Sequence, residues 1–193
     1  LPPPPLDSSA QTRSEIAELV SIEAARTPEA AARAAADSEE TVWRFAETLG
    51  PKFTKESLPL VGALFGRLHE TEGAVVDPAK GVFARPRPYR LNDQLHPVAK
   101  LSKSASYPSG HATGGTLMGI VLANMVPEKR REIMARAWEY GWNRAVAGVH
   151  YRSDIEAGRI AGSVIAQALF ARDDFRAQYE AARKELRFAL GLP

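Results

Sequence analysis

The chain contains no cysteine among its 193 residues. Disulfide bonds, thiolate catalysis and cysteine-ligated metal centres are therefore excluded, although secreted and cytosolic proteins can both lack cysteine. Long apolar runs are also missing. The two most apolar stretches, Thr116–Val126 and Ile160–Ala171, are shorter than the roughly 20 residues needed to span a bilayer. We therefore expect no membrane span.

A strong excess of one charge is likewise absent. The 25 basic and 23 acidic residues give a formal net charge of +2, and the two signs are interspersed along the chain. Because nucleic-acid-binding domains gather basic residues on one face, we expect no polymeric nucleic acid as partner. An apolar fraction of 45% is typical of globular proteins, and this length suits one sizeable core. We predict a single domain over residues 1–193.

Helical patterns dominate the chain after its proline-rich start. The four prolines in Leu1–Pro5 rule out a helix there, so residues 1–11 are expected to form an extended arm. No later segment shows the sustained alternation of a half-buried strand. The sequence therefore predicts an all-α, compact helical bundle. Its predicted helices cover residues 13–26, 28–36, 38–49, 55–72, 111–125, 127–141, 153–171 and 173–190.

The first of three motifs lies in a segment that we predict to be irregular, Gly73–Ser106. This segment contains four prolines and little periodicity, and long irregular stretches in compact domains are more often functional than accidental. It carries Lys80 and, after six residues, Arg87–Pro88. Taken alone, both cations are ordinary surface charges, and the neighbours Arg85 and Arg90 mean that composition does not single out Arg87.

The second motif, Pro108–Ser109–Gly110–His111, stands directly before an apolar predicted helix. A helix N-terminus offers free N–H groups and a positive potential, which together form an anion site. Gly110 permits close approach of a ligand, and Ser109 can donate a hydrogen bond or cap the helix. The alternative is a simple turn with a capping serine and an uninvolved histidine.

The third motif is Arg144, His150 and Asp154. His150 and Asp154 lie four residues apart and share one face if a helix opens near Tyr151 or Ser153. A carboxylate on one ring nitrogen fixes the imidazole tautomer and leaves the other nitrogen able to attack phosphorus. In the alternative interpretation, Asp154 only caps the helix, although capping and catalysis are compatible.

No metal or other cofactor is expected, because no group of His, Asp and Glu shows the spacing of an established metal site. The two remaining histidines, His69 in a predicted helix and His96 before a proline, belong to no such pattern. We interpret both as structural.

Together the motifs resemble the signature Lys-x6-Arg-Pro, Pro-Ser-Gly-His, Ser-Arg-x5-His-x3-Asp. This signature marks the superfamily of type-2 phosphatidic acid phosphatases, bacterial acid phosphatases and vanadium haloperoxidases. The chain is most similar to the class A bacterial non-specific acid phosphatases. The segments that carry this similarity are Leu1–Pro5, Leu101–Lys103, Ser106–His111 and Gly148–Asp154.

The resemblance implies a metal-free phosphomonoesterase of the helical acid phosphatase and haloperoxidase type, which can extend to phosphotransfer and is inhibited by vanadate. His150 would be the nucleophile that forms a phosphohistidine, Asp154 would orient it, and His111 would protonate the leaving alcohol. The phosphoryl oxygens would be held by Lys80, Arg87, Ser109, Gly110 and Arg144.

The resemblance also implies small phosphate monoesters as substrates, a homo-oligomer, and a periplasmic protein whose signal peptide has been removed. Two positions depart from the family pattern: Asn143 stands where a serine normally precedes the signature arginine, and Val149 replaces a frequent tyrosine. The alternatives are a vanadate-dependent haloperoxidase, disfavoured by the short chain, and a non-catalytic phosphate-binding module. A lipid phosphatase is disfavoured by the missing membrane spans.

Overall fold

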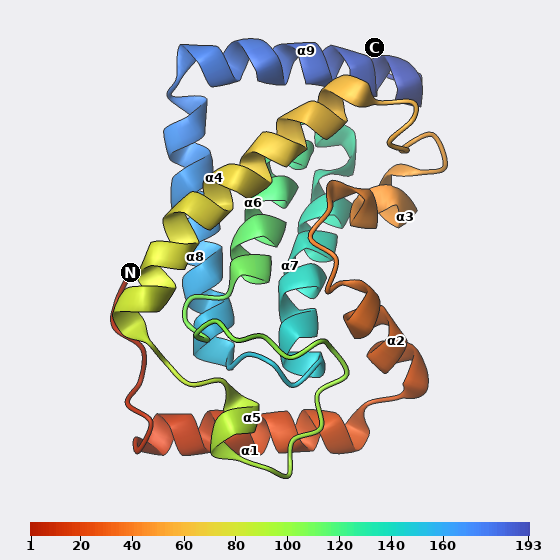
Figure 1. The fold of residues 1–193 in the computed structure, drawn as a ribbon. Helices are drawn as coiled ribbons and strands as arrows, with labels where there is room; N and C mark the ends of the chain where they lie inside the picture. The colour runs from red at the N-terminus through yellow and green to blue at the C-terminus, as the bar shows by residue number, and fades with distance from the viewer.

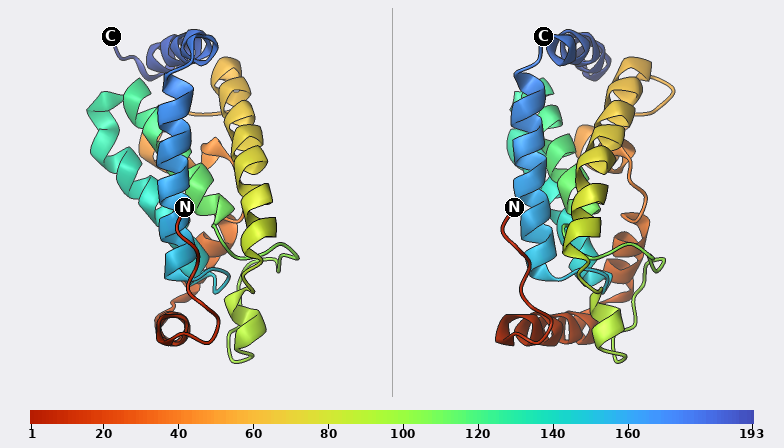
Figure 2. Two further views of the ribbon diagram at one scale, coloured as in Figure 1. Left: turned by 90° about the vertical axis from the view of Figure 1, so that its left-hand side faces the viewer. Right: turned by 60° about the vertical axis from the view of Figure 1, so that its left-hand side comes forward.

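Three long helices, α6 (Gly110–Met125), α7 (Arg130–Val146) and α8 (Arg152–Phe170), form the centre of the computed structural model, which describes residues 1–193. In Figure 1, α6 and α8 run in one direction and α7 in the other, and α6 packs against both. Helix α4 (Pro59–Phe83) crosses in front of them. Helices α1 (Ala10–Ala25) and α9 (Asp173–Leu190) lie across opposite ends of this group (Figures 1 and 2).

The remaining elements are short and connect these helices. They are α2 (Pro28–Ala36), the 3-10 helix η1 (Val42–Phe45), α3 (Ala46–Leu49), α5 (Pro88–Leu91) and the 3-10 helix η2 (Pro127–Lys129). No strand is present. The prediction of an all-α fold is confirmed. The largest hydrophobic core is formed where α4, α6, α7, α9 and η1 meet, around side chains such as Leu64, Val121 and Phe45.

Glycines allow α6 to lie unusually close to both of its neighbours. A Cβ atom built on Gly115 of α6 would stand only 2.7 Å from the ring of Tyr140 in α7. A Cβ atom on Gly158 of α8 would stand 2.5 Å from the carbonyl oxygen of Ser109, at the start of α6. Neither position has room for a side chain, so these small residues set how closely the three helices pack.

This packing gathers four helix ends at one end of the molecule. The C-terminal ends of α4 and α7 and the N-terminal ends of α6 and α8 all lie toward α1 (Figure 1). The three sequence motifs occupy these ends and the loops that follow them. Residues that are far apart in the sequence therefore come together beside α1.

Several local predictions are confirmed by the caps. Thr27 caps α2 through its side chain, and Pro28 takes the first helical position. The N-terminal arm is shorter than predicted, because Ser9 caps α1 and the helix begins at Ala10. The Tyr107 hydroxyl donates a hydrogen bond to the Pro2 carbonyl at 2.6 Å.

Two predicted segments were wrong. Residues 38–41 do not open a helix: Thr41 caps η1 through its side chain, and regular helix begins only at Ala46. In the other segment, α4 continues to Phe83, so Lys80 lies in the last helical turn and not in an irregular loop. Pro78 is tolerated inside α4 because it lies on the exposed face, where water can bind the carbonyl that proline leaves unpaired.

Candidate active site

His150 and Asp154 form a buried pair at the start of α8. His150 is 1% exposed, and its Nδ1 atom lies 3.2 Å from Oδ2 of Asp154. Helix α8 begins at Arg152, and the same Oδ2 atom accepts the Tyr151 N–H at 3.0 Å. Asp154 therefore caps the helix and holds His150 at once. Because a carboxylate only accepts, the His150 proton resides on Nδ1 and the lone pair on Nε2.

Arg85 and Ser106 complete the surroundings of Asp154. Arg85 Nη1 donates to Oδ1 at 2.7 Å, and the Ser106 hydroxyl donates to Oδ2 at 2.5 Å. Burial raises the pKa of Asp154, and Arg85 and the other donors oppose this rise. With four donors on its two oxygens, the carboxylate is held ionised. Arg85 in turn is held by Glu15 of α1 at 3.0 Å.

Sequence reasoning did not select Arg85, and no spacing in the sequence marks it. Its partner Glu15 lies 70 residues earlier, so the link between them exists only in the folded chain. Arg85 is only 2% exposed, whereas an arginine in a loop is expected to be solvated.

Arg87 contacts the other ring nitrogen of His150, the candidate nucleophile. Its Nη1 atom lies 3.0 Å from Nε2 of His150 and donates to the Val149 carbonyl at 3.1 Å. The Ser104 carbonyl accepts from Arg87 Nε at 3.1 Å. The guanidinium is therefore fixed against Nε2, where a ligand of His150 would bind.

Arg144 and Lys80 add two further cations. Arg144 is 4% exposed, its Nη1 atom donates to the Ser38 hydroxyl at 2.9 Å, and its buried Nε has no hydrogen-bond partner. Lys80 lies beside the start of α6, since a Cβ atom on Gly110 would stand 3.8 Å from its Nζ. Buried donors without partners are costly unless an anion satisfies them. This set suits a multiply charged oxyanion.

Burial and the neighbouring cations together favour the neutral form of His150. Burial lowers the pKa of His150 well below its usual value, and the positive charges of Arg87, Lys80 and Arg144 lower it further. The imidazole therefore stays neutral into the acidic range. A neutral ring keeps the lone pair that nucleophilic attack requires.

Ser109 and Gly110 bring the N-terminus of α6 to the same place. The Ser109 hydroxyl accepts from the Ala112 N–H at 3.3 Å and so caps the helix, while its own N–H donates to the Asp154 carbonyl at 3.0 Å. Gly110 is the first residue of α6 and is buried. The positive end of the α6 helix dipole thus lies beside Lys80.

His111 is held at both ring nitrogens. Nδ1 lies 2.8 Å from Oε1 of Glu40, and Nε2 lies 3.0 Å from the Ser38 carbonyl oxygen. Since both partners are acceptors, a ring protonated at both nitrogens would donate to both. Delivery of a proton to an ester oxygen therefore requires one contact to be exchanged. Neither Ser38 nor Glu40 was identified from the sequence, because their segment was assigned to a helix.

The two departures from the family pattern have structural roles. The Asn143 amide donates a hydrogen bond to Oδ2 of Asp37 at 2.7 Å. Oδ1 of this buried carboxylate accepts a hydrogen bond from Arg136 Nη2 at 2.5 Å. Asn143 therefore joins a buried network between α2 and α7. Val149 packs with Ala34 in a small hydrophobic cluster, so it belongs to the protein core.

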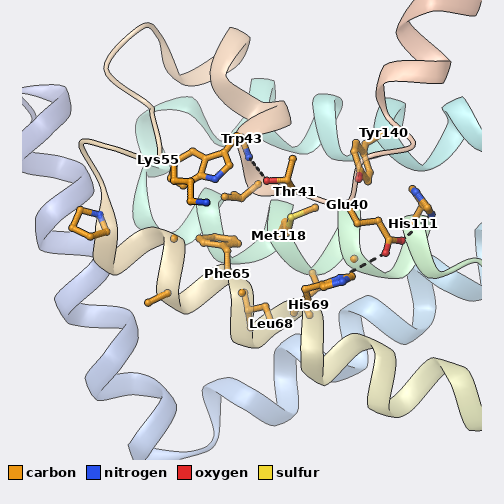
Figure 3. Close-up of a pocket in the computed structure, with 17 residues that line it drawn as sticks. Glu40, Thr41, Trp43, Lys55, Phe65, Leu68, His69, His111, Met118 and Tyr140 are labelled. Atoms are coloured by element: carbon orange, nitrogen blue, oxygen red, sulfur yellow. Dashed lines mark hydrogen bonds and ion pairs between the residues drawn. The ribbon is translucent and has the colours of Figure 1, made fainter.

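A cavity of about 450 Å³ opens beside His111. Figure 3 shows His111, Glu40 and His69 at one end and Lys55 with Trp43 at the other. Its walls are mostly apolar and aromatic, and include Trp43, Phe65, Met118 and Tyr140. The cavity can therefore receive an organic group attached to an anion held near His150.

Comparison with solved structures supports the fold. A transmembrane PAP2-type phosphatidylglycerolphosphate phosphatase from Bacillus subtilis superposes with a TM-score of 0.60 at 17% identity, covering 87% of this chain and 89% of that one. At this identity the likeness concerns the fold alone. In the present chain, none of the helices combines the length and hydrophobicity that crossing a membrane requires.

Sequence comparison defines the family more narrowly. Residues 60–177 match the sequence model of the PAP2 superfamily. The non-specific acid phosphatase of Providencia stuartii is 30% identical over 194 residues, covering 96% of this chain and 78% of its own length.

Two other relatives are matched over shorter regions. The acid phosphatase of Zymomonas mobilis subsp. mobilis and the non-specific acid phosphatase of Salmonella typhimurium are each 38% identical, over 133 and 112 residues, or 67% and 56% of this chain. The chain spans about half the length of these two relatives, 50% and 45% respectively. By these matches and its three motifs, the chain belongs to the PAP2 superfamily, among the class A bacterial non-specific acid phosphatases.

Proposed function

We propose that the protein hydrolyses phosphate monoesters through a phosphohistidine intermediate on His150, without a metal ion. One observation carries this proposal: Nε2 of His150 bears the lone pair, because Asp154 holds Nδ1, and it is flanked by a fixed arginine. Relatives named acid phosphatase support the reaction class.

In the first half-reaction, the phosphoryl group would displace the contact between Arg87 and Nε2 of His150. Attack by Nε2 forms the P–N bond as the P–O ester bond breaks, and His111 gives its proton to the departing alkoxide. Charge on the equatorial oxygens would be stabilised by Arg87, Arg144 and Lys80 and by the N-terminus of α6. Asp154 would stabilise the positive charge that develops on the ring.

In the second half-reaction, a water molecule takes the place of the alcohol. Neutral His111 accepts a proton from this water as its oxygen attacks phosphorus, and the P–N bond breaks to release inorganic phosphate. His150 regains its lone pair and His111 its proton. An alcohol in place of water would give phosphotransfer by the same steps.

The cavity beside His111 supports substrates with a bulky organic group. A leaving group protonated by His111 must extend away from the cations, and the cavity begins at that histidine. Aromatic walls such as Trp43 and Phe65 favour aryl or other flat apolar groups. We accordingly expect aryl phosphates to have lower KM values than small alkyl phosphates.

The test is hydrolysis of p-nitrophenyl phosphate by wild type and by His150→Ala, with His96→Ala as the matched control. His96 is an exposed histidine paired with Glu23 at 2.9 Å. Turnover and rapid-quench phosphate labelling should vanish only in His150→Ala. Labelling of a serine would overturn the mechanism, and bromide oxidation with vanadate and peroxide in place of hydrolysis would favour a haloperoxidase.

Location and assembly remain part of the proposal. The family resemblance supports export to the periplasm and a homo-oligomer. Fractionation of cells expressing the full-length protein, together with light scattering of the purified chain, tests both expectations.

A further inference from the structure

Three side chains, Glu40, His69 and Glu72, converge beside His111, and two of them, Glu40 and His69, line the cavity. His69 and Glu72 lie three residues apart on one face of α4, and Glu40 reaches them from the loop before η1. One potential ligand atom from each lies within 4.8 Å of the others. Glu40 Oε2 and His69 Nδ1 are 3.7 Å apart, and Figure 3 shows this pair bordering the cavity.

Glu72 is the unusual member of this cluster. The residue is 4% exposed, and its Oε1 atom is buried without any hydrogen-bond partner. A buried carboxylate oxygen normally has a partner, because an unsatisfied one costs free energy. His69, by contrast, is 55% exposed at its side chain. The cluster thus joins an unsatisfied buried oxygen to an accessible imidazole, so an ion could reach it and retain water ligands.

We infer that Glu40, His69 and Glu72 form a divalent-cation site adjacent to the groups that would hold the phosphoryl oxygens, since a Cβ atom on Gly110 would stand 3.1 Å from Glu72 Oε1. Two carboxylate oxygens and one imidazole nitrogen are the ligands of borderline cations such as Zn²⁺ or Mn²⁺. The ionised Glu40 carboxylate offsets the repulsion that Lys80 and a protonated His111 would exert on an ion there.

The site would be coupled to the proposed reaction through Glu40. One oxygen of this carboxylate contacts His111 at 2.8 Å, and the other faces His69. An ion bound by the second oxygen would compete for the carboxylate that positions His111. We therefore expect bound cation to inhibit hydrolysis, an expectation that rests on the proposed function, whereas cation binding itself does not.

Binding is tested by calorimetric titration of the metal-stripped full chain with Zn²⁺ in a non-chelating buffer. Wild type and the control His96→Ala should bind one equivalent with equal affinity, and His69→Ala and Glu72→Gln should bind at least tenfold more weakly. His96 is a suitable control because it pairs with Glu23 but does not belong to the cluster of three potential metal ligands. Thermal unfolding establishes that each variant is folded, and His69→Gln replaces His69→Ala if that variant is not.

Equal affinity in wild type and folded His69→Ala, or no stoichiometric binding to wild type, would overturn the site. Hydrolysis is then measured as the ratio of rates with and without Zn²⁺. This ratio should fall in wild type and His96→Ala and stay near one in His69→Ala. An equal fall in His69→Ala would overturn the coupling. A protein that binds Zn²⁺ but hydrolyses no monoester would contradict the proposed function and leave the site intact.

Discussion

At the scale of single residues, Arg85 holds Asp154 of the His150–Asp154 pair without a hydrogen bond to His150 itself. It binds the Asp154 oxygen that faces away from His150, and Glu15 and Thr12 hold its other terminal nitrogen. Its guanidinium also lies 3.8 Å from the centre of the Tyr151 ring. A lysine could supply the charge but not this fork of donors.

Arg85→Ala should lower kcat roughly 10²-fold, because loss of the anchor lets Asp154 and His150 drift from the attacking geometry. KM should change far less, since Arg85 is not among the groups proposed to bind phosphate. The kcat of Arg85→Lys should lie between the kcat of wild type and that of Arg85→Ala. The measurement is steady-state hydrolysis of p-nitrophenyl phosphate by folded variants. A variant with normal kcat and raised KM would place Arg85 in substrate binding instead.

His111→Ala should discriminate between leaving groups. For alkyl phosphates, kcat/KM should fall by roughly 10²–10⁴, because their alkoxides need a proton as the ester bond breaks. The p-nitrophenolate group leaves without needing a proton, so kcat/KM for p-nitrophenyl phosphate should fall clearly less. The check is the slope of log(kcat/KM) against leaving-group pKa, which should steepen in the variant. An unchanged slope would mean that His111 only binds.

Glu72 should make stability depend on pH. Burial raises the pKa of Glu72 from 4.5 to about 8. The folded state therefore keeps a proton that the unfolded state loses as pH rises through this window, and stability declines. Glu72→Gln removes the titration, so its free energy of unfolding relative to wild type should rise by about 1 kcal/mol per pH unit across the window. Urea unfolding from pH 5 to 8 measures this, and a constant difference would contradict it.

At the scale of elements, the contact between α8 and the start of α6 determines how closely the second and third motifs approach. The Ser109 N–H donates to the Asp154 carbonyl across this contact. Gly158 makes the approach possible, because its absent Cβ atom would stand 2.9 Å from Cβ of Ala112 and 2.5 Å from the Ser109 oxygen.

Gly158→Ala should separate the two helices, destabilise the fold by about 1–3 kcal/mol and reduce activity more than its stability loss alone explains. Gly66→Ala is the matched control, because Gly66 lies inside α4 and nothing stands within 4 Å of a Cβ atom there. Replacing that glycine should stabilise the protein by roughly 0.5–1 kcal/mol. Thermal unfolding of both variants provides the test, and equal effects would contradict it.

The sequence predicted helices well where periodicity and caps act locally, as at Thr27 and Pro28 of α2. It failed at residues 38–41, where distant partners determine the path of the chain. Asp37 is fully buried beneath Arg136 and Asn143, about 100 residues later. The candidate site shows the same division. The motif residues were predicted from their resemblance to a known signature, whereas Arg85 and Glu40 acquire their partners only in the folded molecule.

At the scale of the whole molecule, a chain with a net charge of only +2 brings three basic side chains together around one buried histidine. Four helix ends meet there and place Lys80, Arg87 and Arg144 around His150. Burial and neighbouring positive charge lower the pKa of Lys80. Burial also brings the pKa of Arg144 to about 10, so Arg144 remains charged at neutral pH. In the proposed reaction these fixed cations would supply the charge that a metal ion provides in metal-dependent phosphatases.

Chelation should therefore leave hydrolysis unimpaired. After prolonged treatment with EDTA, kcat should equal or slightly exceed that of untreated enzyme, since any cation at the Glu40–His69–Glu72 cluster is expected to inhibit. Vanadate should inhibit competitively, because its oxygens would occupy the positions that the three cations stabilise in the transition state. The measurement is the initial rate over a range of substrate and vanadate concentrations, before and after chelation. Loss of activity on chelation that Zn²⁺ or Mg²⁺ restores would show that side-chain cations alone do not suffice.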